Sequence, residues 1–238
     1  MNVYVMDSYD DMSEKAFTIV KEFITNKPNA VLGLSTGGTP IGLYEKMIED
    51  YKNQGTSYAN CISYNLDEYV EIDPKHPESY VSFMHRTLFD HIDLKPENIH
   101  MPSGSTQDDC DAYEQALKST TLDLQILGIG SNGHIGFNEP GTPFDMETHI
   151  VALTESTRKD NARFFDNDMK QVPHHAMSMG IASIMRSKKI ILLASGENKA
   201  DAIAQLVNGI KSEACPATAL QAHDDVTIIV DKSAGSKL

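Results

Sequence analysis

The residues best suited to chemistry gather in one glycine-rich segment, Gly128–Thr142, with the sequence GIGSNGHIGFNEPGT. It follows the apolar run Leu122–Leu127, which is typical of a buried strand. Glycine lets a backbone turn sharply and approach a ligand closely, and such loops often hold catalytic residues. His134 can transfer a proton near neutral pH, and Glu139 follows closely enough to orient it. The alternative is a glycine-rich connector that contains a histidine by chance.

A second candidate, Asp67, comes directly after the predicted strand 61–66. Ligands of an open α/β sheet bind outside the carboxyl ends of its strands, so we expect Asp67 to face the same crevice as His134. A helix cap or a solvated loop acid is the alternative for Asp67. Because no serine or cysteine nucleophile is placed beside His134, the set of Asp, His and Glu favours acid–base catalysis over covalent catalysis.

A third segment is suited to anion binding, because it joins a strand at 30–34 to a helix through small residues. These are Ser35, Thr36, Gly37, Gly38 and Thr39. Pro40 then suits the start of the helix, and the amide N–H groups of such a loop can hold an anion. No lysine follows the glycines, so the loop indicates a phosphate or carboxylate rather than a nucleotide in particular. A tight turn without a ligand is the alternative. Further positive charge is available from Arg158, Arg163 and Lys199.

The elements that must position these residues alternate between strand and helix along the whole chain. Strands are predicted at 2–6, 30–34, 61–66, 122–130, 148–153, 188–194 and 226–230, with an edge segment at 95–100. Helices are predicted at 8–26, 40–51, 79–90, 106–118 and 178–185, and after Gly196. This order predicts a doubly wound three-layer α/β/α sandwich with a mainly parallel sheet, in a single domain over residues 1–238. Residues 155–175 are the best candidate for a mobile lid, and the tail 231–238 is expected to be frayed.

Composition excludes several classes of protein. The 238 residues have a net charge of −14 and contain no basic run, which disfavours binding to nucleic acid or to an anionic membrane. No apolar run approaches the roughly 20 residues of a membrane span, and the N-terminus does not resemble a signal peptide. The three separated cysteines predict reduced thiols in a cytoplasmic protein. The histidines lack the usual spacing of metal ligands, so no metal site is expected.

Four stretches resemble the glucosamine-6-phosphate deaminases: LGLSTGGTPIGLYEKM (32–47), NLDEYV (65–70), GIGSNGHIGFNEPGT (128–142) and NARFF (161–165). The resemblance implies conversion of glucosamine 6-phosphate and water to fructose 6-phosphate and ammonia, without a cofactor. It implies that Asp67 is the base that moves a proton from C2 to C1, and that His134, held by Glu139, assists opening of the sugar ring. It also implies a phosphate site, formed by the loop 35–39, Thr142, Arg163 and Lys199.

The chain departs from the longer members of that family at Asn132, where they have an acid two residues before the histidine. Asparagine can donate a hydrogen bond, but it supplies no charge to the imidazole. Longer members also extend further at the C-terminus and form allosteric hexamers, so we expect a non-allosteric monomer. Two alternatives remain: a 6-phosphogluconolactonase-like lactone hydrolase, which usually has DER where this chain has Asp67-Glu68-Tyr69, and a non-catalytic sugar-phosphate sensor.

Overall fold

A seven-stranded parallel sheet forms the centre of the protein in its computed structural model, which describes the backbone of residues 1–238 and every side chain except those of Ser156 and Asp160. The strand order is β1-β10-β9-β6-β2-β3-β5, and each neighbouring pair is parallel. The strands are β1 (Asn2–Met6), β2 (Val31–Leu34), β3 (Ile62–Asn65), β5 (Ile99–His100), β6 (Leu124–Leu127), β9 (Ile190–Ala194) and β10 (Val226–Asp231).

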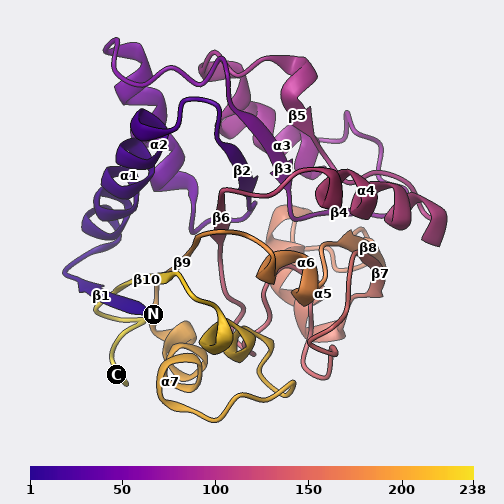
Figure 1. Cartoon of the computed structure of the whole chain (residues 1–238). Coiled ribbons are helices and arrows are strands. Elements are labelled where there is room, and N and C mark those ends of the chain that lie inside the picture. Colours follow the sequence, from indigo (N-terminus) through magenta and orange to yellow (C-terminus); the bar gives the residue numbers. More distant parts are fainter.

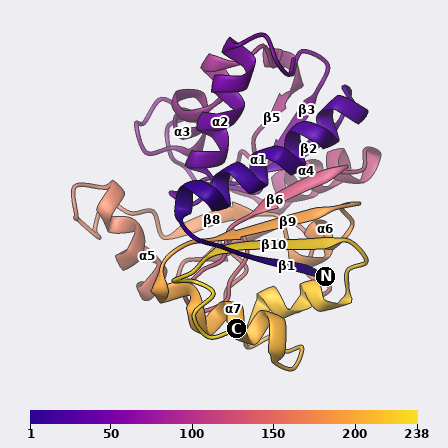
Figure 2. The same ribbon diagram turned by 90° about the vertical axis from the view of Figure 1, so that its left-hand side faces the viewer.

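Helices cover both faces of this sheet (Figures 1 and 2). One face packs against α1 (Tyr9–Asn26), α2 (Ile41–Lys52) and α3 (Tyr80–Thr87). The other packs against α4 (Gln107–Ser119), α6 (Ile181–Met185) and α7 (Ala200–Asn208). The short 3-10 segments are η1 (Phe89–His91), η2 (Pro96–Asn98), η3 (Ala162–Phe164), η4 (Glu197–Lys199) and η5 (Pro216–Ala222). The predicted three-layer α/β/α sandwich is therefore confirmed.

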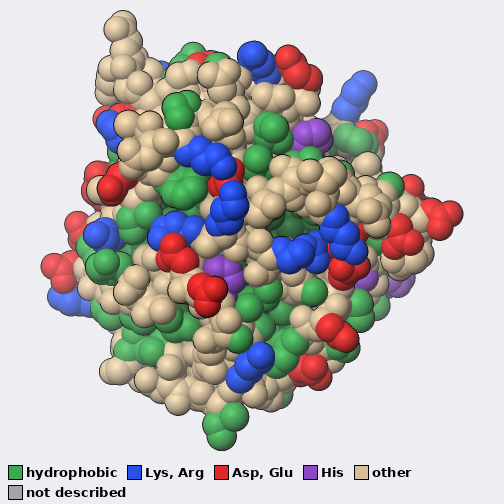
Figure 3. Space-filling view, viewed as in Figure 1, with side chains coloured by type: hydrophobic (Ala, Val, Ile, Leu, Met, Phe, Trp, Pro, Cys, Tyr) green, Lys and Arg blue, Asp and Glu red, His purple; other side chains and the backbone are tan. Residues whose placement is uncertain are grey.

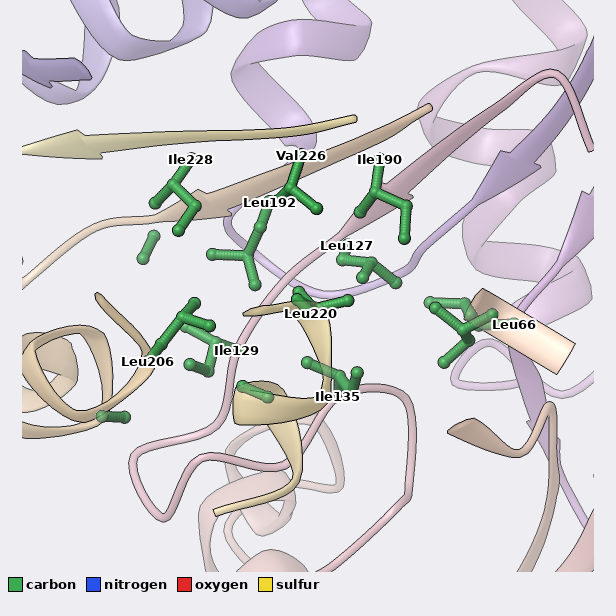
Figure 4. Packing of buried hydrophobic residues seen from close by; sticks show 14 of the residues in the cluster. Leu66, Leu127, Ile129, Ile135, Ile190, Leu192, Leu206, Leu220, Val226 and Ile228 are labelled. Carbon is green, nitrogen blue, oxygen red and sulfur yellow. The ribbon is translucent and has the colours of Figure 1, made fainter. Parts of the chain in front are cut away.

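The core explains why the central strands are apolar at nearly every position. Successive residues of a strand point to opposite faces, and a parallel sheet is covered on both faces. Leu192 and Ile228 accordingly belong to the cluster around α7 and η5 (Figure 4), whereas Leu193 and Ile229 belong to the cluster around α1 and α2.

Local sequence signals account for the helix starts. Ser8 caps α1, accepting a hydrogen bond from the backbone N–H of Asp11 at 3.1 Å. Thr106 and Asp109 form a capping box at the start of α4. The helix predicted over 79–90 is shorter than expected, because Leu88 leaves helical geometry (φ −148°) and η1 follows.

The path of the chain creates a crevice at the carboxyl ends of β2 and β6. From β2 the chain proceeds outward to β3 and β5, and it then returns to β6 on the other side of β2. Ligands of open α/β sheets bind where the strand order reverses in this way. The loops 35–39 and 128–134 are the segments that leave these two strands.

A second, antiparallel sheet lies beside this crevice, and the sequence did not predict it. It contains β4 (Asp67–Tyr69), β8 (His175–Ser178) and β7 (His149–Ala152), in the order β4-β8-β7. Asp67 therefore begins a new strand instead of ending β3. The prediction of a helix from Ser178 is wrong, because that residue pairs with Asp67 in the sheet and α6 starts only at Ile181. The predicted lid contains α5 (Glu155–Asn161) and η3.

The tail 231–238 is not frayed as predicted. Asp231 belongs to β10, and its carboxylate accepts a hydrogen bond from the backbone N–H of Ala234 at 2.7 Å. The side chain of Ala234 is fully buried in the core around α7. Within the described part of the chain, no helix is both long and apolar enough to cross a bilayer.

Candidate active site

A cavity of about 470 Å³ opens at the carboxyl ends of the central strands. Nine residues expected at the site line it: Ser35, Thr36, Gly37, Gly38, Thr39, Asp67, His134, Arg163 and Lys199. The remaining predicted site residues, Asn132, Glu139 and Thr142, are not among the residues that line it. The cavity therefore brings together the acid, the histidine and the glycine-rich loop, which are far apart in the sequence.

Asp67 is buried at the start of β4, with 6% of its surface exposed. None of the hydrogen bonds among the described residues reaches its carboxylate. Burial, helped by the negative charge of Glu68, raises the pKa of Asp67 to about 8. Asp67 can therefore accept or return a proton near neutral pH, as a general base must.

Glu68 has a different task, which the sequence did not reveal. Its carboxylate accepts hydrogen bonds from the backbone N–H groups of Tyr69 (2.8 Å), Tyr80 (3.0 Å) and Val81 (2.9 Å). Burial raises the pKa of Glu68, and these three backbone donors oppose the rise. Glu68 thus joins β4 to the start of α3 and fixes the backbone beside Asp67.

His134, Glu139 and Asn132 form a connected group. His134 Nδ1 lies 3.6 Å from Glu139 Oε2 and is buried without a hydrogen-bond partner among the described residues. Asn132 Nδ2 donates to the same Oε2 at 2.7 Å, and Asn132 Oδ1 accepts from the backbone N–H of His134 at 3.2 Å. Asn132 therefore bridges the side chain of Glu139 and the backbone of His134 without adding a charge.

Glu139 remains ionised throughout the physiological range. Burial by itself would raise the pKa of Glu139, but the contacts with His134, Thr157 and Asn132 together lower it to about 2. This carboxylate lies 3.6 Å from Nδ1 of the ring and can orient the imidazole. Gly130 packs against the same ring: a Cβ at Gly130 would lie 2.3 Å from His134 Cε1, so only glycine leaves room for the histidine.

The loop 35–39 has the geometry of an anion site. Gly37 adopts a φ of +92°, which favours glycine. No hydrogen bond within the described chain uses the amide N–H groups of residues 36–39, so these donors remain available to a ligand. Two tyrosines brace the loop: Tyr44 donates to the carbonyl of Ser35 at 2.6 Å, and Tyr9 OH lies 3.1 Å from the carbonyl of Gly38. The sequence did not indicate this role for either tyrosine.

Positive charge reaches the cavity from two segments. Lys159 of α5 and Arg163 of η3 line it, and the guanidinium of Arg163 lies 4.7 Å from the centre of the Phe164 ring. Lys199 lines it from η4. In the face drawn in Figure 3, Lys and Arg side chains gather near the middle, while many acidic side chains lie toward the outline. Cations thus concentrate locally on a strongly acidic protein.

Two candidates for anion binding do not line the cavity, and their side chains contact backbone carbonyls. Thr142 donates its hydroxyl to the carbonyl of Glu139 at 2.7 Å, which closes a turn away from the cavity. Arg158 donates to the carbonyls of Met169 (2.8 Å) and Val172 (3.3 Å) and holds the segment after η3. Its neighbour Lys159, which the sequence did not single out, is the α5 cation that lines the cavity.

The loop between β9 and Lys199 is tied to β10 by Asp231. The Asp231 carboxylate accepts from Ser195 Oγ at 2.5 Å and from the backbone N–H of Gly196 at 3.1 Å. Burial would raise the pKa of Asp231, but these donors and the N–H of Ala234 lower it overall. Asp231 therefore supports the position of the segment that carries Lys199.

Asp231→Asn is expected to lower the free energy of unfolding by about 1–3 kcal/mol at pH 7, because charge-assisted hydrogen bonds are lost. Since the folded-state pKa is depressed, this contribution is present above the unfolded-state pKa and disappears as the pH falls through the folded-state pKa. Urea unfolding at pH 7 and pH 3 measures the difference. Asp201→Asn, on the surface of α7, is the control and should change little; equal losses in both variants would contradict the role of Asp231.

The chain is similar to known proteins along almost its whole length. Residues 6–229 match the family model described as glucosamine-6-phosphate isomerases/6-phosphogluconolactonase. The glucosamine-6-phosphate deaminase of Thermoanaerobacter sp. (strain X514) is 50% identical over 99% of this chain and 94% of its own. That of Halalkalibacterium halodurans is 49% identical over 100% of this chain and 98% of its own.

Solved structures agree with these matches. The structure of a monomeric glucosamine-6-phosphate deaminase is 44% identical, covers 100% of both chains and superposes with a TM-score of 0.97. The 6-phosphogluconolactonase of Trypanosoma brucei, at 17% identity, covers 100% of this chain and 98% of its own with a TM-score of 0.82, which is a similarity of fold alone. The resemblance found in the sequence is thus confirmed, and the chain belongs to the family of glucosamine-6-phosphate isomerases and 6-phosphogluconolactonases.

Proposed function

We propose that this protein converts glucosamine 6-phosphate and water to fructose 6-phosphate and ammonia. The observation that carries the proposal is the placement of Asp67 and His134 in one cavity with the amide groups of the loop 35–39. An anion site and two proton-transfer groups are what the isomerisation of a sugar phosphate requires. Identity near 50% to proteins named glucosamine-6-phosphate deaminase, over nearly the whole chain, supports this substrate.

The loop 35–39 would hold the phosphate group of the substrate. Four backbone N–H donors and the positive charges of Arg163 and Lys199 would supply hydrogen bonds and compensate its charge. Binding the phosphate, which takes no part in the reaction, places the reacting carbons against the catalytic groups. Lys159 is a further candidate for this part of the site.

His134 would assist opening of the pyranose ring by moving a proton between the ring oxygen and the C1 hydroxyl. Glu139, ionised and 3.6 Å from Nδ1, would stabilise the imidazolium that forms. Asn132 would hold Glu139 in place in this chain, where longer relatives use an acid.

Asp67 would then take the proton from C2 of the open-chain sugar and return it at C1. This transfer converts the amino aldose to a ketose imine, which water hydrolyses to fructose 6-phosphate and ammonia. A pKa of about 8 makes the Asp67 carboxylate basic enough to abstract a carbon-bound proton near neutral pH and allows it to hold that proton until it is returned.

We also propose a domain organisation, an oligomeric state and a cellular location for the enzyme. We propose that residues 1–238 act as one catalytic domain. We also propose that the protein is a monomer, because the closely similar solved deaminase is described as monomeric. Three buried, unpaired cysteines support a cytoplasmic location, where thiols stay reduced.

The purified protein is expected to release one ammonia for each fructose 6-phosphate formed from glucosamine 6-phosphate. A coupled glutamate dehydrogenase assay measures the ammonia, and phosphoglucose isomerase coupled to a dehydrogenase measures the ketose. N-Acetylglucosamine 6-phosphate is the control, because its acylated nitrogen should yield no ammonia. If glucosamine 6-phosphate releases no ammonia while 6-phosphogluconolactone is consumed, the protein is a lactonase instead.

A further inference from the structure

Thr157 lies between α5 and the group that holds His134. Its side chain is buried, with 4% of the residue exposed, and it also lines the cavity. The Thr157 hydroxyl donates a hydrogen bond to Glu139 Oε1. Glu139 therefore contacts α5 through one carboxylate oxygen, while its other oxygen, Oε2, faces Asn132 and His134.

The ionised state of Glu139 determines the direction of these hydrogen bonds. An ionised carboxylate only accepts, so the Thr157 hydroxyl must be the donor to Oε1. Thr154 Oγ1 lies 3.2 Å from the same Oε1 and 3.1 Å from Thr157 Oγ1, and it also accepts from the backbone N–H of Thr157. Thr154 is the N-cap of α5: its oxygen accepts from the helix, and its O–H can donate to Glu139 Oε1 at 3.2 Å, so Thr157 is the closer of two donors to that oxygen.

The contact restrains the carboxylate of Glu139. The last torsion of a glutamate side chain is broad, so a carboxylate held at one oxygen can rotate. Thr157 at Oε1 and Asn132 at Oε2 hold both oxygens and keep Oε2 directed toward His134 Nδ1. This buried nitrogen has no other partner among the described residues, so the orientation of the ring depends on Glu139.

We propose that Thr157 is a positioning residue, which acts through Glu139 to keep His134 oriented for ring opening; this inference rests on the proposed function. The same helix and the η3 segment after it bring Lys159 and Arg163 to the cavity. The group that opens the sugar ring is therefore complete only when α5 packs against Glu139. Thr157 thus links the helix that carries Lys159 to the group that holds His134.

Thr157→Val tests the inference, because valine keeps the shape of threonine and replaces the hydroxyl with a methyl group, which cannot donate a hydrogen bond. We expect kcat for ammonia release to fall about tenfold or more, since small losses of alignment are costly, while KM changes less than about threefold. Thr157→Ser restores the donor and should restore most of kcat. Thr56→Val is the matched control: Thr56 is also buried, its hydroxyl has no partner among the described residues, and it lies outside the cavity.

A double-mutant cycle separates this role from simple packing of α5. If Thr157 acts through Glu139, Thr157→Val should lower kcat far less in a Glu139→Ala background than in the wild type. A loss of equal size in both backgrounds, a rise in KM at unchanged kcat, or failure of Thr157→Ser to restore activity would overturn the positioning role. A wild-type enzyme that releases no ammonia would overturn the proposed function itself. Thermal unfolding of each variant confirms that only folded proteins are compared.

Discussion

Asp67→Asn is expected to lower kcat for ammonia release by about 10²–10⁴-fold, which is the usual contribution of a general base. Asparagine matches aspartate in size but cannot take the proton from C2. Because the proposed phosphate site is elsewhere, at the loop 35–39, KM should change much less than kcat. Steady-state kinetics of the purified variant at pH 7–9 measures both constants.

Asp123→Asn is the matched control for this experiment. Asp123 is also a buried aspartate, but it pairs with Lys27 at 2.5 Å and with Lys188 at 2.9 Å, outside the cavity. Its replacement should leave kcat within a few-fold of the wild-type value. Near-normal turnover in Asp67→Asn would show that another group abstracts the proton.

The same Asp67→Asn variant is expected to be more stable than the wild type at neutral and alkaline pH. Burial raises the pKa of Asp67 to about 8 in the folded protein, from an ordinary value of 3.8. Between these values the folded state holds a proton that the unfolded chain releases, so Asp67 makes the wild type less stable as the pH rises. Each pKa unit corresponds to about 1.4 kcal/mol, and we expect a gain of about 2–5 kcal/mol for the variant at pH 8.

The pH dependence of this difference in stability tests whether charge burial causes it. Urea unfolding should show almost no gain for Asp67→Asn at pH 4, and a gain that grows up to about pH 8. Asp123→Asn should show the opposite sign. Burial would raise the pKa of Asp123, but its lysine partners and the N–H of Val31 lower it overall, so the ionised form stabilises the fold above pH 4. A constant gain at every pH would mean that charge burial is not the cause.

At Asp67 the requirements of stability and of the proposed activity conflict. A carboxylate held out of water without a hydrogen-bond partner costs folding free energy, and the same environment makes it basic enough to act on a carbon acid. Enzymes commonly accept such local instability at catalytic positions. Glu68, the next residue, is also buried but receives three backbone hydrogen bonds, which suits a structural task.

Local signals predicted most of the main sheet and its helices. Apolar runs such as Ile190–Ala194 and caps such as Ser8 act through neighbours in sequence, so their structures follow from short stretches. The antiparallel sheet was missed because its stability comes from partners far apart in the chain: Asp67 pairs with Ser178, and neither flanking segment has a strong strand pattern. The tail was missed for a similar reason, since burial of Ala234 depends on the core around α7.

The sequence by itself determined the family, and it predicted that the loop 35–39, Asp67 and His134 lie together, because the segments that follow the strands of a doubly wound sheet converge. Only the tertiary structure decided which neighbouring side chains reach that site. On α5, Lys159 lines the cavity while Arg158 holds backbone carbonyls, because adjacent helical residues point about 100° apart. Thr142 follows Glu139 closely in sequence, yet its hydroxyl contacts the backbone carbonyl of Glu139, whereas Thr157, 18 positions from Glu139, contacts the carboxylate. Hydrogen-bond partners depend on how elements pack, and local patterns in the sequence do not reveal that packing.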